Sequence, residues 1–263
     1  MGTKIKRAVS LYFSPLDTTR RVVHSVAQGL DAPESLELDR TSFDSRWQGV
    51  ELGEGDVAVI GMPVYYGRVP KILVEFFRYI QAKDIPAVVV VAYGNRDYED
   101  ALLELYNESR KHGFNPVAAG AFVGQHSFTD KLGTGRPNAE DLADAYMLGQ
   151  KALEILEKAD SPAGFELKVK GNFPYTPGSD LPIAPVTDKE KCVGCMQCQK
   201  NCPVLAINPL DPGDVDGWRC LDCGKCIAEC KAGAKSLAQP ALREKIAIME
   251  AMFTAPKQSE LFY

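Results

Sequence analysis

Runs of apolar residues bounded by turn residues recur through the first half of the chain. They lie at 8–13, 56–62, 86–92 and 116–124, and a short alternating stretch lies at 36–38. The run Pro86–Ala92 is apolar at every position, which is typical of a strand covered on both faces and therefore of a parallel sheet. The pattern predicts five strands, the first of them within Lys4–Phe13.

Between these strands the apolar residues recur at helical spacing. Helices are predicted at 20–30, 70–80, 97–112 and 138–159. Pro70 stands in the first turn of the second helix, and Gly113 follows the third as a C-cap. Strands alternating with helices predict an α/β fold with a doubly wound, five-stranded parallel sheet. Such sheets bind ligands beyond the carboxyl ends of their strands, where the strand order reverses.

Length and composition favour two small domains and exclude several classes of protein. The chain has 263 residues, of which 45% are hydrophobic, and its mean hydropathy is −0.16. A net charge of −5 argues against a general nucleic-acid binder. No apolar run approaches the ~20 residues of a spanning helix, so no membrane span is expected. The stretch 161–185 holds five prolines and three glycines and is predicted to be a linker over the domain surfaces.

All eight cysteines lie in one C-terminal block. They form two copies of one spacing, with three cysteines at two-residue intervals and a fourth after three residues: Cys192, Cys195, Cys198 and Cys202, then Cys220, Cys223, Cys226 and Cys230. This spacing is typical of bacterial 4Fe–4S sites. Three thiolates on a tight turn bind one cluster, while the fourth points elsewhere. The metal-ligand prediction is therefore two 4Fe–4S clusters.

Disulfides and structural zinc are the alternatives for this block. Disulfides need an oxidising compartment. The apolar run Ala8–Phe13 after the basic start is too short for the core of a signal peptide and is followed by polar turn residues, so we expect a cytoplasmic protein with free thiols. Three cysteines at two-residue intervals would crowd a single zinc ion. Iron–sulfur ligation is the favoured interpretation.

The stretch 186–236 resembles a bacterial-type two-cluster ferredoxin, a small α+β domain. The resemblance implies crossed ligand sets. Cluster one would be bound by Cys192, Cys195, Cys198 and Cys230, and cluster two by Cys220, Cys223, Cys226 and Cys202. Lys231 stands where that family usually has proline, which adds a donor and a cation beside cluster one and would raise its potential.

The loop Ser14–Thr19 follows the first strand and precedes a helix. Hydroxyl groups in such a turn, together with free backbone donors, can hold a phosphate group. The loop resembles the flavodoxin phosphate-binding pattern at Ser14 and Thr19, but departs from it at Leu16 and Asp17. Two interpretations of Asp17 remain open: its carboxylate faces the phosphate and repels it, or it caps the helix and faces away.

Two further loops, Pro63–Arg68 and Tyr93–Tyr98, are expected at the same sheet edge. They resemble the ring-clamping loops of flavodoxin-like proteins that carry a ferredoxin domain, although tyrosines at strand ends are often only half-buried packing. The resemblance implies FMN as cofactor, bound by Ser14, Leu16, Asp17, Thr18, Thr19, Pro63, Val64, Tyr65, Tyr66, Gly67, Arg68, Tyr93, Gly94, Asn95, Arg96 and Tyr98. No catalytic residue is assigned.

Two features beyond these loops match the same group. Gln125–Phe128 contains His126, which is interpreted as a histidine that orders its loop rather than as a catalytic base. Asn138 is predicted to cap the following helix, with Asp141 at the third helical position.

Over nearly its whole length the chain resembles an electron-transfer iron–sulfur flavoprotein of the fused flavodoxin/ferredoxin group. The expected divisions are a flavodoxin-like domain at 1–160, a linker at 161–185, a ferredoxin domain at 186–236 and a C-terminal helix and docking tail at 237–263. Expected partners are redox proteins or small electron acceptors, and a homodimer stays open. Two alternatives remain: a flavin-free ferredoxin with a docking domain, and a flavin-dependent reductase with its own small-molecule substrate. Whether the chain is an enzyme is left open.

Overall fold

The computed structural model describes residues 4–159, 165–178 and 182–263. Its main sheet contains β1 (Arg7–Tyr12), β2 (Glu34–Asp39), β4 (Asp56–Pro63), β6 (Ile85–Tyr93), β7 (Phe114–Val123) and β10 (Glu260–Phe262). The larger helices are α1 (Thr18–Gly29), α3 (Ala101–Lys111), α4 (Ala139–Lys158) and α7 (Pro240–Met252). The shorter elements are η1 (Asp44–Trp47), β3 (Val50–Glu51), α2 (Leu73–Phe77), β5 (Ile80–Gln81), β8 (Val186–Thr187), α5 (Gln197–Lys200), α6 (Lys225–Ala228) and β9 (Lys235–Ser236).

The order of strands in the main sheet is β10-β7-β6-β4-β1-β2. The strands β2, β1, β4, β6 and β7 are parallel to one another. Counted along the chain, these five have the order 2-1-3-4-5, which is the flavodoxin-like doubly wound topology. The predicted fold class is therefore confirmed. The strand order reverses between β1 and β4, so the loops that follow these two strands flank the expected ligand position.

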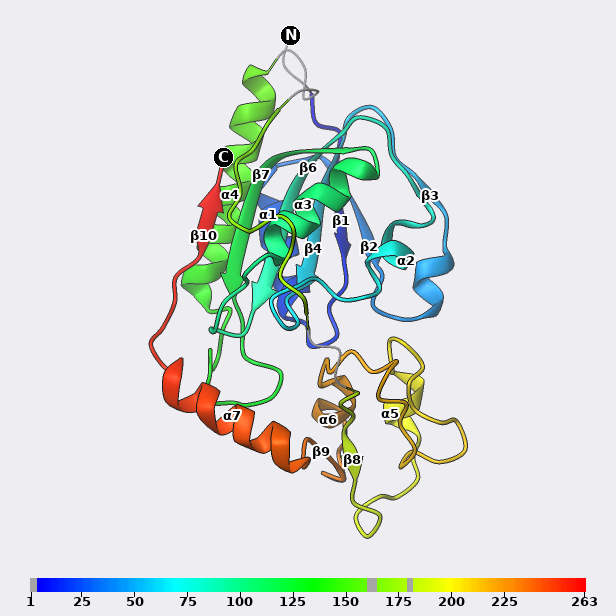
Figure 1. Cartoon of the computed structure of the whole chain (residues 1–263). Coiled ribbons are helices and arrows are strands. Elements are labelled where there is room, and N and C mark those ends of the chain that lie inside the picture. The colour runs from blue at the N-terminus through cyan, green and yellow to red at the C-terminus, as the bar shows by residue number, and fades with distance from the viewer. Residues whose placement is uncertain (1–3, 160–164, 179–181) are drawn as a thin grey trace.

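Helices cover both faces of the sheet (Figure 1). In β6, Val88 and Val90 pack on the side of α1 and α4, whereas Val89 and Val91 pack on the side of α2 and α3. Both sets are fully buried. This two-sided burial explains why Pro86–Ala92 is apolar at every position.

Two helices are shorter than their sequence pattern predicts. The helix expected from Pro70 to Ile80 is limited to α2, because Ile80 instead pairs with Val50 as part of β5. The helix expected from Asp97 begins at Ala101. Asp100 just before it is fully buried, and its carboxylate accepts backbone N–H bonds from linker residues 172 and 176, at 2.7 and 2.6 Å. Tertiary contacts of these segments outweigh their helical periodicity.

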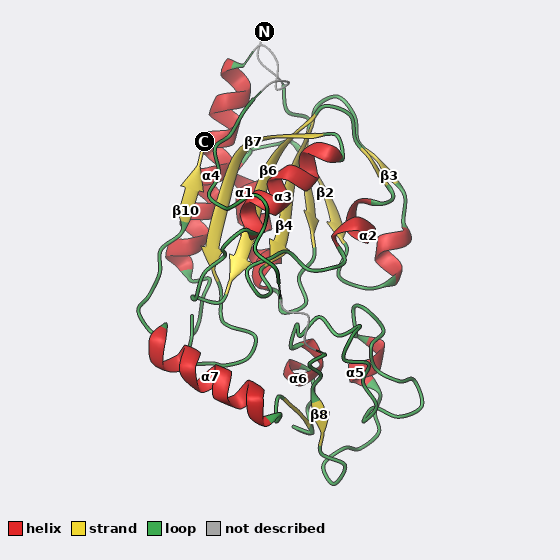
Figure 2. Cartoon of the chain, viewed as in Figure 1, coloured by secondary structure: helices red, strands yellow, loops and turns green. Residues whose placement is uncertain are grey.

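The ferredoxin domain lies beyond the carboxyl end of the sheet and consists mostly of loops (Figure 2). From it, α7 runs back beneath the sheet edge, and the tail returns along β7 (Figure 1). The tail forms β10, which pairs antiparallel with β7 through Leu261 and Gly120. The predicted docking of the tail is thus confirmed, and the docked segment adds a sixth strand that the sequence pattern did not show.

The predicted linker 161–185 lies partly outside the described residues. Its described part runs over the α/β domain, where Arg68 donates to the carbonyl oxygen of Thr176 at 2.9 Å. In the described portion of the chain, no helix has the length and apolar character needed to cross a membrane.

Candidate cofactor site

A cavity of about 560 Å³ lies at the carboxyl edge of the sheet. Eleven of the sixteen residues predicted to bind FMN line it: Ser14, Leu16, Thr18, Thr19, Pro63, Val64, Tyr65, Tyr66, Tyr93, Gly94 and Arg96. The loop 124–128, Glu99, the linker residues Pro177 and Gly178, residue Asp222 of the ferredoxin domain and one face of α7 form further parts of the wall. The structure therefore brings the three predicted loops together, as parallel strands require.

The first loop presents the N-terminus of α1 to this cavity. The Ser14 hydroxyl accepts a hydrogen bond from the backbone N–H of Arg20 at 3.0 Å, so Ser14 caps the third helical position. Among the described residues, nothing accepts from the backbone N–H groups of Thr18 and Thr19. Unpaired first-turn donors at the positive end of a helix form an anion site.

Asp17 does not line this cavity. It occupies the N-cap position with a left-handed backbone (φ 67°), where flavodoxins have glycine, but its side chain makes no capping bond. Its carboxylate instead accepts from the guanidinium of Arg20, and its side chain is 51% exposed. Of the two open interpretations, the first is wrong, and the second holds for the position and direction of Asp17 but not for its capping bond. The carboxylate faces away from the cavity, and Ser14 supplies the capping bond.

The second loop turns sharply at Tyr66, whose φ is +54°. The Tyr66 hydroxyl donates to Asp222 at 2.8 Å. Burial, with a further contribution from the Asp222 charge, raises the pKa of Tyr66, so the phenol stays neutral. Arg68 and Gly67 lie outside the cavity. Arg68 forms two hydrogen bonds to Glu104, at 2.7 and 2.6 Å, and its guanidinium lies over Tyr175.

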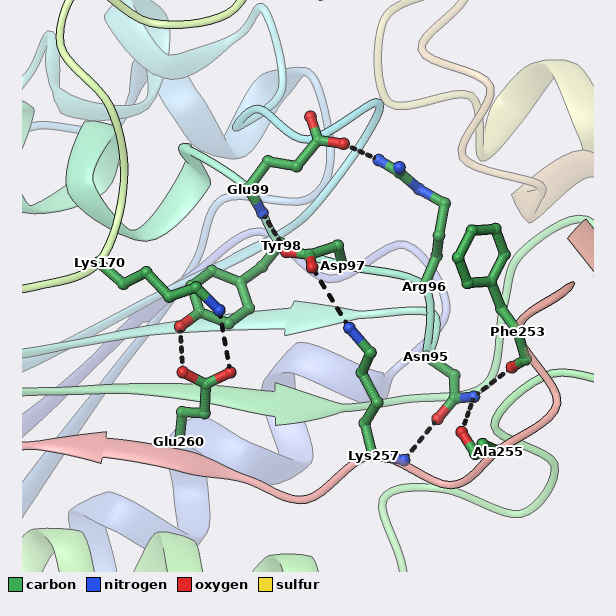
Figure 3. A network of polar contacts seen from close by, with 10 residues as sticks. All are labelled: Asn95, Arg96, Asp97, Tyr98, Glu99, Lys170, Phe253, Ala255, Lys257 and Glu260. Carbon is green, nitrogen blue, oxygen red and sulfur yellow. Dashed lines mark hydrogen bonds and ion pairs between the residues drawn. The ribbon is translucent and has the colours of Figure 1, made fainter.

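In the third loop, Tyr93, Gly94 and Arg96 line the cavity. Other residues of this loop contact the C-terminal segment, as Figure 3 shows. The Asn95 amide donates to the carbonyl oxygens of Phe253 and Ala255, at 2.6 and 3.0 Å, and accepts from the N–H of Lys257 at 3.1 Å. The Tyr98 hydroxyl donates to Glu260 at 2.7 Å. Both residues are buried against the tail and do not line the cavity. Their assignment to FMN is corrected to tail binding.

The fourth loop, 124–128, lines the cavity, although the predicted FMN contacts do not include it. His126 orders it, since its Nδ1 accepts from the N–H of Phe128 at 3.1 Å. Burial and the nearby Arg96 lower the pKa of His126 to about 4, so the imidazole is neutral at pH 7. The resemblance of Gln125–Phe128 to the fused flavodoxin/ferredoxin group is the sequence feature that could have predicted this part of the wall. The predicted capping box of Asn138 and Asp141 is present.

The cysteines line two separate small cavities in the ferredoxin domain. One is lined by Cys192, Cys195, Cys198 and Cys230, and the other by Cys202, Cys220, Cys223 and Cys226. The structure therefore groups the cysteines in the crossed sets. Backbone N–H groups point at the crossing sulfurs, from Ala206 to Cys202 and from Ala234 to Cys230, both at 3.3 Å. Such bonds tune the potential of a cluster.

The two sets differ in exposure. Cys195 is exposed, whereas Cys223 is buried and packs within the core of the α/β domain. Burial raises the pKa of the metal-free thiols, to about 12 for Cys223 and about 11 for Cys226. Metal binding must therefore displace thiol protons, and the bound iron offsets the cost of burying thiolates.

The loop Cys220–Lys225 joins the second cysteine set to the large cavity. Asp222 lines the cavity and is 7% exposed. Lys225 donates to the carbonyl oxygen of Pro15 at 3.2 Å, and the Tyr66 hydroxyl holds Asp222 from the other side. The cysteine set of cluster two therefore lies directly behind one wall of the cavity.

The residues present fit FMN. The cavity has the size of typical cofactor sites, about 300–1,000 Å³. Free donors of α1 suit the phosphate, and the apolar side chains of Leu16, Val64 and Phe128 suit a flat aromatic ring. One carboxylate oxygen of Asp222 is buried without a hydrogen-bond partner among the described residues.

Comparison with known proteins identifies the C-terminal part. Residues 184–231 match the 4Fe-4S dicluster domain family. An uncharacterized protein of Methanocaldococcus jannaschii is 39% identical over 49 residues, 19% of each chain. A component of the ion-translocating oxidoreductase complex of Methanosarcina acetivorans is 38% identical over 47 residues, 18% of each chain. The chain thus spans about a fifth of the length of these relatives.

The α/β part has similar solved structures. A flavodoxin from the domain Archaea aligns with 57% of this chain and 98% of its own, at 13% identity and a TM-score of 0.40. The strand order places this part among flavodoxin-like folds. The architecture is a flavodoxin-like domain followed by a 4Fe–4S ferredoxin domain.

Proposed function

We propose that this chain is an electron-transfer iron–sulfur flavoprotein that carries electrons between two 4Fe–4S clusters and FMN. The clusters would be bound by the two crossed cysteine sets, and FMN by the large cavity. Each cluster passes one electron, whereas a flavin accepts one or two. Such a chain couples one-electron donors to two-electron reactions.

One observation carries the proposal: a cluster-binding loop forms a wall of the cavity. Asp222 lies between two cysteines of the second set and lines the cavity itself. Leu221 and Cys223 beside it are buried in the core of the α/β domain. This packing supports direct electron passage between cluster two and a ring held in the cavity.

The exposures of the cysteines support an order of centres. Cys195 of the first set is exposed and Cys223 of the second is buried. An external one-electron partner would therefore meet cluster one first, and cluster two would connect it to the flavin. One relative is a subunit of an oxidoreductase complex, which supports a protein partner for this chain.

The chain's own residues would bind and orient the cofactor. The free N–H groups of Thr18 and Thr19 would donate to the phosphate, assisted by the dipole of α1. The rigid loop that contains Tyr66 would fix one edge of the ring. Because Asp17 is turned outward toward Arg20, the main reason for a flavin-free docking domain is removed.

Cofactor analysis after anaerobic purification tests the proposal. We expect about eight irons, eight acid-labile sulfides and one FMN per chain. Acid precipitation should release FMN, and apoprotein should bind added FMN to saturation. Cluster content without saturable FMN binding would favour the flavin-free alternative.

A further inference from the structure

Helix α7 supplies a wall of the cavity that the sequence did not indicate. Four of its residues line the cavity: Leu242, Lys245, Ile248 and Met249. Their spacings of three and four residues place them on one face of the helix. Figure 1 shows α7 crossing beneath the loops at the carboxyl edge of the sheet. The helix therefore presents one mixed apolar and cationic face to the cavity.

Contacts along its length fix this helix in place. Before α7, the Gln239 amide donates to the carbonyl oxygen of Ala184 at 3.1 Å. Near its end, Glu250 pairs with Lys131 at 2.8 Å. Just after it, the Asn95 amide donates to the backbone at residues 253 and 255 (Figure 3). These contacts hold the helix in its position across the cavity.

Two side chains on the face of α7 toward the cavity have few contacts with the rest of the protein. Ile248 is 51% exposed although it lines a cavity, so little of the protein packs against it. The side chain of Lys245 has no ion pair or hydrogen bond with any described residue. The other cation of the cavity wall, Arg96, is paired with Glu99. Lys245 is therefore the cavity-lining cation available to a bound molecule.

We propose that α7 forms part of the flavin site, with Ile248 and Met249 against the ring and Lys245 placing a positive charge beside it. Apolar contact would stabilise the bound ring by removing its surface from water. Reduction adds electron density to the ring, and a cation near its nitrogen atoms favours the reduced form. Lys245 therefore raises the flavin potential, and Asn95 is a positioning residue that holds α7. This inference rests on the proposed function.

The helix offers matched pairs of variants for the test. Ile248→Glu places a charge against the ring, whereas Met252→Glu makes the same type of change at a residue that is 67% exposed and does not line the cavity. Lys245→Gln removes the cavity cation, and Arg243→Gln removes an exposed cation of the same helix outside the cavity. All four changes are made in the full chain and at exposed positions.

Two measurements are made on each variant: the FMN dissociation constant by fluorescence, and the flavin midpoint potential by redox titration. Ile248→Glu should weaken FMN binding at least about tenfold, and Met252→Glu less than about twofold. Lys245→Gln should lower the flavin potential and weaken riboflavin and FMN binding equally, because its contact is with the ring. Arg243→Gln should change neither quantity.

Three outcomes would overturn the inference while FMN still binds the unaltered chain. These are equal affinities of the Ile248→Glu and Met252→Glu variants, an unchanged potential in Lys245→Gln, or a loss of FMN but not riboflavin affinity in that variant. If the unaltered chain binds no FMN, the proposed function itself fails, which is a distinguishable result.

Discussion

The hydroxyl of Tyr66 donates a hydrogen bond to a carboxylate oxygen of Asp222 at 2.8 Å, across 156 residues of sequence. Both residues have a left-handed backbone, with φ of 54° and 55°. Such conformations are uncommon for residues other than glycine and persist where the surroundings hold them. The bond ties the cluster-two loop to the loop that lines the candidate flavin cavity.

Tyr66→Phe tests the contribution of this bond to stability. Without the phenol, the buried Asp222 carboxylate loses its 2.8 Å hydrogen bond from Tyr66, and its other oxygen already lacks a hydrogen-bond partner among the described residues. We expect a loss of about 1–3 kcal/mol in the free energy of unfolding. Thermal or denaturant unfolding would measure it. Tyr79→Phe, at an exposed tyrosine, is the control and should cost far less. Equal losses would contradict the account.

Asp17→Gly tests the orientation of the phosphate loop. Because Asp17 pairs with Arg20 outside the cavity, FMN affinity should change less than about twofold. Glycine also suits the left-handed backbone at this position. Titration of apoprotein with FMN provides the measurement. A tenfold tightening would mean that the carboxylate faces the phosphate after all.

Ser14→Ala tests the capping role assigned to this hydroxyl. The change removes the acceptor of the Arg20 N–H, and we expect the free energy of unfolding to fall by about 1 kcal/mol. Ser35→Ala on the exposed strand β2 is the matched control, since no hydrogen bond of that side chain is present among the described residues. Indistinguishable unfolding midpoints would refute the capping role.

Cys202→Ser tests the crossed cluster sets. Cys202 follows the first motif but lines the cavity of the second set. The variant should lose or alter the cluster bound by Cys220, Cys223 and Cys226, and Cys198→Ser should affect the cluster that includes Cys230. Electron paramagnetic resonance of the reduced variants separates the two signals. Damage to the opposite cluster in each variant would show that the sets are not crossed.

His126 predicts a specific pH dependence of stability. Its folded pKa of about 4 lies below its ordinary value of 6.5. Between these values the unfolded chain binds more protons than the folded one, so this residue makes stability rise with pH from about 4 to 6.5. Unfolding midpoints of the wild type and His126→Gln, measured from pH 7.5 down to 5.5, should converge as pH falls. A constant difference between the two midpoints would mean that folding does not lower the pKa of His126.

The sequence predicted those parts of the molecule that depend on local pattern. The two-sided burial of Pro86–Ala92 appears as an unbroken apolar run, and the resemblance of the cysteine motifs to a two-cluster ferredoxin implied the crossed sets. The outward turn of Asp17 depends on its pairing with Arg20, which the loop pattern does not show. Asn95 has a side-chain amide that could bind a flavin, but this amide donates its hydrogen bonds to the backbone that follows α7.

The wall formed by α7 was missed for a similar reason. Its lining face contains Leu242 and Ile248, which an amphipathic pattern assigns to a core without naming the partner. The return of the tail to β7, together with the contacts at residues 239, 250 and 253–255, places this helix across the cavity. An amphipathic pattern shows that one face of a helix is covered, but it does not show which distant segment covers that face.

Electron uptake per chain tests the central claim most directly. The anaerobically purified protein would be titrated with a calibrated reductant while its visible absorbance is followed. Two clusters that take one electron each and a flavin that takes two predict about four electrons per chain, with bleaching of the flavin bands. An uptake of about two electrons, with no flavin band to bleach, would contradict the account.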